Sequence, residues 1–167
     1  MDLLLWRHAE AEPGEPDDAR VLTAKGRKQA AKMAEWLDAN LPGSCRILSS
    51  PALRAVQTAE ALGRKFKQHD GLSTGASVDG VLAAIDWPNQ RKPVLIVGHQ
   101  PVLGQLAARL IGNCEQDCTI RKASVWWIAQ RGGDDVVEGD DREAGRVARG
   151  RSRCYLRAVI APDLLRK

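Results

Sequence analysis

Short apolar runs alternate with longer amphipathic stretches along the first half of this chain. Residues 2–6 form an apolar run that is closed by polar residues, which is typical of a buried strand. Over residues 24–41, apolar side chains recur at helical spacing after Thr23, whose hydroxyl suits a helix N-cap. The pattern then repeats: residues 45–48 predict a second strand, and residues 51–67 predict a second helix with a proline at its first position.

The second half of the chain continues this alternation. Residues 78–87 predict a short helix, and the continuous apolar run PVLIV at 93–97 indicates a strand covered on both faces, which we expect at the centre of a sheet. Residues 102–111 predict another helix, and residues 123–129 and 154–160 predict two more strands. Strands that alternate with helices favour an α/β fold in which helices cover a sheet.

Length and composition fit one compact domain, which we expect to span residues 1–167. Of the 167 residues, 44% are hydrophobic and 28% are charged. The formal net charge of +4 is unevenly spread, because residues 132–150 hold six acids and three arginines. The remaining 22 basic residues form no run longer than two. We therefore interpret residues 132–150 as a mobile acidic loop and expect no nucleic-acid partner.

The sequence shows neither a membrane segment nor a metal motif. No apolar run approaches the roughly 20 residues that cross a bilayer, and the first residues lack a basic lead and a cleavage signal. We expect no membrane association and a cytoplasmic location. Of four cysteines, only Cys114 and Cys118 are close in sequence, and neither a second pair nor a nearby histidine completes a metal site. We expect reduced, structural cysteines and no bound metal.

Basic and imidazole side chains follow three of the predicted strands. Arg7 and His8 come directly after the first strand, Arg54 lies shortly after the second, and His99 follows the PVLIV strand. Ligands of open α/β sheets bind outside the carboxyl ends of the strands, so these side chains are expected to converge. Guanidinium groups suit phosphate oxygens, and a neutral imidazole can attack phosphorus. Each residue alone also fits an ordinary structural role, but their joint placement favours a phosphate site.

Four segments occur in a recognisable order: LWRHAEA at residues 5–11, LTAKG at 22–26, SSPALRAVQTA at 49–59 and VGHQP at 97–101. Together they resemble the motifs of the histidine phosphatase superfamily, and its short SixA-like phosphohistidine phosphatases in particular. The resemblance covers nearly the whole chain. It implies a three-layer α/β/α sandwich with a mostly parallel central sheet, and phosphoryl transfer in two steps.

The resemblance also implies a role for each candidate residue. His8 matches the nucleophile of the family, Arg7 and Arg54 match its phosphate clamp, and His99 matches the second histidine, which stabilises the transferring group. No metal or other cofactor is implied, because the arginine and histidine side chains take the role that Mg²⁺ has in other phosphoryl-transfer sites.

Two features depart from the family pattern. Ala9 replaces the glycine of the RHG motif, and an alanine does not adopt the positive φ that glycine adopts freely. No motif marks a general acid: Asp79 is the best candidate, although an acid at a helix start also has an ordinary explanation. An enzyme without a general acid is expected to favour a substrate with a good leaving group, such as phosphohistidine.

The leading hypothesis is a metal-independent phosphohistidine phosphatase that acts through phospho-His8 on a phosphorylated signalling or phosphotransfer protein. Only 44 residues separate Arg54 from His99, which leaves little room for a lid and favours a protein substrate. Two alternatives stay open: a phosphatase of small phosphorylated metabolites, and a non-catalytic module that binds phosphate or a phosphoprotein. The oligomeric state is not predicted.

Overall fold

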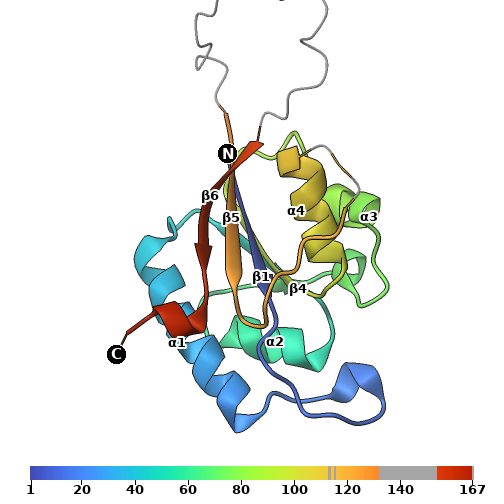
Figure 1. The fold of residues 1–167 in the computed structure, drawn as a ribbon, viewed down its shortest axis with the longest axis vertical. Helices are drawn as coiled ribbons and strands as arrows, with labels where there is room; N and C mark the ends of the chain where they lie inside the picture. Colours follow the sequence, from blue (N-terminus) through green and yellow to red (C-terminus); the bar gives the residue numbers. More distant parts are fainter. Residues whose placement is uncertain (113, 115, 132–153, 167) are drawn as a thin grey trace, which may run out of the picture.

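A six-stranded sheet with strand order β3-β2-β4-β1-β5-β6 forms the middle of the molecule (Figure 1). This computed structural model describes residues 1–112, 114, 116–131 and 154–166. The strands are β1 (Asp2–Arg7), β2 (Arg46–Ser49), β3 (Lys67–Gln68), β4 (Val94–Gly98), β5 (Val125–Gln130) and β6 (Cys154–Ile160). Neighbours from β3 to β1 pair in parallel, whereas β5 pairs antiparallel with both β1 and β6. The expected mostly parallel sheet is therefore confirmed, with the PVLIV strand β4 beside β1 at its centre.

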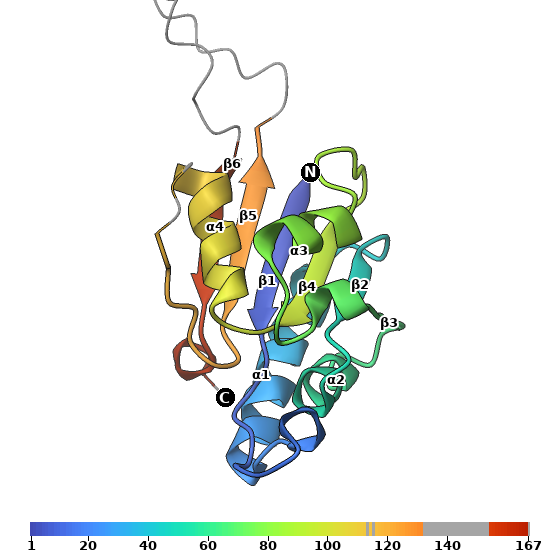
Figure 2. The same cartoon turned by 90° about the vertical axis from the view of Figure 1, so that its right-hand side faces the viewer.

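Helices cover both faces of the sheet. The α-helices are α1 (Ala24–Asn40), α2 (Leu53–Glu60), α3 (Val78–Ala84) and α4 (Val102–Gly112), and the 3₁₀ helices are η1 (Asp17–Ala19), η2 (Asp70–Leu72) and η3 (Pro162–Leu164). Along β1, Leu4 and Trp6 pack with α1 and α2, whereas Leu3 and Leu5 pack with α3 and α4, because side chains alternate along a strand. Figures 1 and 2 show the resulting layers. The fold is a three-layer α/β/α sandwich, as predicted.

The ends of the predicted elements differ most at the second helix. α1 follows the expected cap, since Thr23 Oγ1 accepts a hydrogen bond of 2.9 Å from the backbone N–H of Gly26. The predicted helix over residues 51–67 is wrong at both ends: α2 starts after Pro51 and stops at Glu60. Gly63 adopts a φ of +68°, which ends the helical path and releases the chain to pair as β3 beside β2.

The two adjacent tryptophans of β5 show how the sheet is covered, and the remaining expectations concern the cysteines and the acidic segment. Trp127 packs in the core on the α1 side, and Trp126 packs against the opposite core, so the two rings flank the sheet as β alternation requires. None of the four cysteines forms a disulfide bond in the described structure. Within the described part of the chain, no helix has the length and apolar character needed to cross a membrane. The predicted loop at residues 132–150 lies outside the described residues.

Candidate functional site

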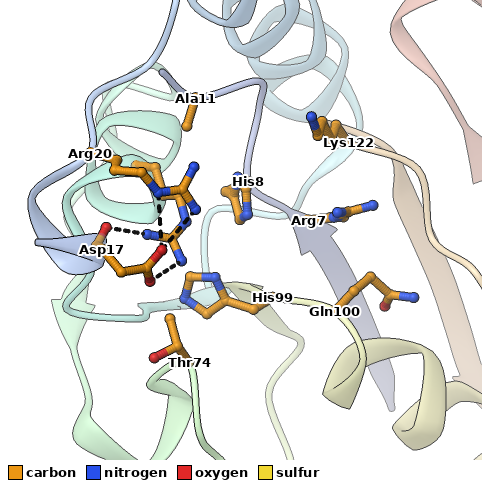
Figure 3. Close-up of a pocket in the computed structure, with 10 residues that line it drawn as sticks. Arg7, His8, Ala11, Asp17, Arg20, Thr74, His99, Gln100 and Lys122 are labelled. Carbon is orange, nitrogen blue, oxygen red and sulfur yellow. Dashed lines mark hydrogen bonds and ion pairs between the residues drawn. The ribbon is translucent and has the colours of Figure 1, made fainter. Parts of the chain in front are cut away.

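The carboxyl ends of β1 and β4 open into a cavity of about 290 Å³, which also receives the first turn of α2. It contains all four residues that the sequence singled out as a phosphate site. Figure 3 shows the lining residues, which are Arg7, His8, Ala11, Asp17, Arg20, Arg54, Thr74, His99, Gln100 and Lys122. Parallel pairing of β1 with β4 sets Arg7 opposite Gly98, so the residues that follow these strands lie side by side. The sheet register thus brings His8 and His99 together, with ring centroids 5.2 Å apart.

His8 is held from both sides of its backbone. Its N–H donates to Gly98 O at 3.1 Å, and its carbonyl accepts from Ala123 N at 3.1 Å. The ring nitrogen Nδ1 lies 2.8 Å from Ala9 O, and a carbonyl oxygen only accepts, so Nδ1 carries the proton and Nε2 keeps its lone pair. Burial lowers the pKa of His8 to about 4; the Ala9 hydrogen bond opposes this shift, and nearby arginines, Arg54 first, add to it. The ring is therefore neutral at pH 7.

The alanine of the RHA motif fits its position. Ala9 is fully buried, and its N–H donates to Thr58 Oγ1 at 3.0 Å. Ala9 is not among the described residues with a positive φ, so the backbone here does not require a glycine.

His99 carries a buried nitrogen without a protein partner. Its Nε2 lies 2.7 Å from Ser50 Oγ, which also accepts a hydrogen bond of 3.2 Å from Ala52 N. Its Nδ1 is buried and has no hydrogen-bond partner among the described residues. Burial is the main cause that lowers the pKa of His99 to about 3, with His8 and Arg54 contributing in the same direction. His99 is therefore also neutral at pH 7.

Each of the two predicted arginines has one side-chain nitrogen without a hydrogen-bond partner among the described residues. The Arg54 side chain is only 4% exposed; its Nη1 donates to Asp17 O at 2.8 Å and its Nη2 to Asp17 Oδ2 at 3.0 Å. Arg7 donates through Nη1 to Ile120 O at 2.9 Å. The Nε atoms of both arginines are buried and unpaired within the described structure. Each arginine therefore keeps a donor that no described residue uses, on a side chain that lines the cavity.

Asp17 and Arg20 belong to the site although the sequence did not single them out. The Asp17 carboxylate accepts from Arg54 and from Arg20 Nε, the latter at 3.0 Å, and these contacts, Arg54 foremost, lower the pKa of Asp17. Both residues lie in or beside η1, within a stretch rich in Pro, Gly and acids that predicted only a loop. Several acids of this stretch have similar sequence neighbours, so no sequence signal distinguishes Asp17 from the others.

The structure does not bring Asp79 to the cavity. Asp79 lies in the first turn of α3, forms an ion pair with Arg109 at 2.6 Å, and has a side chain that is 86% exposed. Its role is the ordinary one of an acid at a helix start. Among the described residues that line the cavity, the acid is Asp17, which is ionised at pH 7 because its pKa is lowered.

Comparison with known proteins identifies the family of this chain. The family model of the histidine phosphatase superfamily (branch 1) matches residues 3–75. The chain is 32% identical over 129 residues to a phosphohistidine phosphatase SixA homolog of Haemophilus influenzae, covering 68% of this chain and 79% of that protein. It is 30% identical over 125 residues to the phosphohistidine phosphatase SixA of Escherichia coli, covering 66% and 74%.

A solved structure has the same fold. The protein histidine phosphatase SixA complexed with tungstate superposes with a TM-score of 0.75 at 22% identity, and the match covers 99% of this chain and 100% of that one. Sequence similarity and fold thus agree, and the chain belongs to the SixA-like branch of the histidine phosphatase superfamily and is a phosphatase.

Proposed function

We propose that this phosphatase removes the phosphoryl group from phosphohistidine in a signalling or phosphotransfer protein, through phospho-His8 and without a metal ion. One observation carries the proposal: two arginines, Arg7 and Arg54, line one cavity together with the neutral rings of His8 and His99. Guanidinium and imidazole groups in one cavity suit the oxygens of a phosphoryl group. Permanent charges of the two arginines would offset the negative charge of the transferring group, as Mg²⁺ does elsewhere.

The first step transfers the phosphoryl group to His8. Because Nδ1 donates to Ala9 O, the lone pair of Nε2 is free to attack phosphorus. A P–Nε2 bond forms while the P–N bond to the substrate histidine breaks, and the leaving imidazole takes that electron pair. When its other ring nitrogen already carries a proton, it leaves as neutral imidazole and needs no acid.

His99 assists best with its single proton on Nδ1. At pH 7 its ring is neutral, since its pKa is about 3, and it therefore has one N–H. If Ser50 Oγ–H donates to Nε2, Nδ1–H is free to donate to a phosphoryl oxygen. In the second step water attacks phosphorus, the P–Nε2 bond breaks, and inorganic phosphate leaves.

The acid–base character of the cavity favours phosphohistidine over most phosphate esters. The acidic lining residue Asp17 is ionised and held by Arg54, so it is a poor proton donor for an alkoxide leaving group. The rim residues Asp17, Thr74 and Lys122 are exposed, which suits a phosphorylated side chain presented by a protein surface. Relatives in Haemophilus influenzae and Escherichia coli that carry the name phosphohistidine phosphatase support the same substrate class.

The test is turnover of a phosphohistidine-bearing protein, with trapping of the labelled enzyme. We expect His8→Ala to abolish both phosphate release and labelling, because the nucleophile is lost. His69→Asn is the matched control: His69 is exposed, lies outside the cavity, and caps η2 through an acceptor that asparagine keeps. A chelator should leave the rate unchanged. Undiminished turnover by His8→Ala would overturn the mechanism.

A substrate panel separates the proposal from its nearest competitor. A cavity of about 290 Å³ also admits a small phosphorylated metabolite. We expect kcat/KM for a phosphohistidine protein to exceed that for phosphomonoesters with alkoxide leaving groups, because those esters need a proton donor. Faster hydrolysis of a small phosphoester than of any phosphohistidine would assign the enzyme to metabolite substrates instead.

A further inference from the structure

A tight turn of residues 121–124 is attached directly to the end of the nucleophile strand. The turn is closed by a hydrogen bond of 3.0 Å from Ser124 N to Arg121 O. Four hydrogen bonds join this region to the end of β1: Trp6 Nε1 to Ala123 O (2.9 Å), Arg7 Nη1 to Ile120 O (2.9 Å), Arg7 N to Ser124 O (3.1 Å) and Ala123 N to His8 O (3.1 Å). The position of the turn is thus set by the same residues that set His8.

The turn adopts an unfavourable backbone conformation. Ala123 has a φ of +60°, in the left-handed region that non-glycine residues rarely adopt, and its side chain is fully buried. Surrounding hydrogen bonds hold it there, and strained residues of this kind gather at functional sites. As a result, Lys122, which directly precedes Ala123, is presented from a fixed backbone at the cavity rim.

Lys122 is the rim cation whose charge is not used within the described structure. It lines the cavity on the side of Arg7, across His8 from Asp17 and Arg20 (Figure 3). Arg20 is paired with Asp17, and both ends of the Gln100 amide are occupied, by Cys118 O and Gly104 N. No hydrogen bond or ion pair engages the ammonium group of Lys122 in the described part of the chain.

We propose that Lys122 contributes to substrate recognition: it binds an acidic side chain that flanks the phosphohistidine on the partner protein. The inference rests on the proposed function and names the chemistry of its partner. Arg7, Arg54 and His99 are at most partly exposed and line the cavity around His8, whereas Lys122 is exposed at the mouth, where the surface carrying the phosphohistidine must lie. A lone ammonium there attracts carboxylates and repels a basic surface.

Binding of synthetic peptides tests this independently of turnover. The peptides carry a non-hydrolysable phosphohistidine analogue, with one glutamate moved through the four positions on either side, and glutamine peptides serve as references. For the unsubstituted enzyme, we expect at least one glutamate position to tighten binding by about two- to fivefold, as one exposed charge pair does. Lys122→Ala should abolish this preference, and Lys122→Glu should reverse it, so that the glutamine peptide binds more tightly than the glutamate peptide at that position.

Arg121→Ala is the matched control. Arg121 occupies the same turn and carries the same charge, but it pairs with Asp163 at 3.4 Å and does not line the cavity. We expect Arg121→Ala to keep the glutamate preference. Equal binding of all peptides by the enzyme and Lys122→Ala would overturn the inference, and so would an equal loss in Arg121→Ala.

Turnover of free phosphohistidine separates the two proposals. Free phosphohistidine has no flanking side chain, so Lys122→Ala should lose less kcat/KM for free phosphohistidine than for a phosphohistidine peptide with the preferred glutamate. An equal loss for both substrates would mean that Lys122 binds the phosphoryl group itself, which contradicts the inference. If no phosphohistidine substrate is hydrolysed at all, the proposed function fails, while peptide binding still decides the role of Lys122.

Discussion

The hydroxyl of Ser50 contacts two groups at the edge of the cavity, the ring of His99 and the backbone N–H of Ala52. Ser50→Ala removes both contacts and leaves two buried groups unpaired, since Ser50 is fully buried. Each such group costs about 1–3 kcal/mol. Because the contact with Ala52 is the longer one at 3.2 Å, we expect the free energy of unfolding to fall by about 2–4 kcal/mol.

The same substitution should lower activity more than stability explains. Without the Ser50 hydroxyl, no contact in the described structure keeps the proton of His99 on Nδ1, so the ring loses its role as a fixed donor. Loss of one transition-state donor lowers kcat by about 10²–10³-fold. Kinetics on a phosphohistidine protein at a temperature where the variant is folded measures this loss, and ¹⁵N NMR of the imidazole nitrogens reports the tautomer.

Ser49→Ala provides the control for the loss of a buried hydroxyl. Ser49 is equally buried and donates to Ser50 O at 2.9 Å, but it does not contact His99. We expect it to cost about 1 kcal/mol of stability and to leave kcat/KM within about twofold. An Nε2–H tautomer in the unsubstituted protein, or unchanged kcat/KM in Ser50→Ala, would refute the reasoning.

Three further outcomes follow from the structure. The pKa of His8 is lowered from 6.5 to about 4, so between these pH values the unfolded chain binds a proton that the folded chain excludes. The free energy of unfolding should therefore fall as pH drops from about 6.5 through 4, and urea titrations should show a shallower fall in His8→Ala. Gly26→Ala should cost about 1–3 kcal/mol in thermal unfolding, because a Cβ there would collide with the backbone of Glu10, whereas Gly43→Ala meets open space and should be neutral. Arg54→Lys keeps the charge but loses the guanidinium fork, so kcat/KM should drop by at least about 10²-fold, while Arg64→Lys at an exposed ion pair should not change it.

Local pattern was enough to predict most of the elements and four residues of the site. The apolar runs that became β1 and β4 are buried on both faces, so their hydrophobicity alone marks them as central strands. Once those strands are parallel neighbours, Arg7-His8 and His99 must meet at one edge of the sheet, because the carboxyl ends of parallel strands coincide. The meeting of these residues therefore follows from the short segments once β1 and β4 are neighbours, and that strand order comes from the tertiary structure.

Other features depend on contacts between segments far apart in sequence. α2 ends early because Gly63 turns the chain and residues 67–68 find a partner in β2, which no helical pattern reveals. Likewise, Asp17 differs from the acids around it only because folding sets it against the buried Arg54. Asp79 instead forms an ion pair with Arg109, on the other side of the sheet.

The difference between features that the sequence predicts and features that only the fold determines has a physical reason. Periodicity and turn residues act over a few positions, and so a sequence determines which segments form strands and helices and which side chains stand at their ends. The partner of a charged side chain is chosen by whichever opposite charge or buried donor the assembled layers bring within about 3–4 Å. The tertiary structure alone therefore decided that Asp17 holds Arg54, that Ser50 orients His99, and that Lys122 lies at the mouth of the cavity without a partner among the described residues.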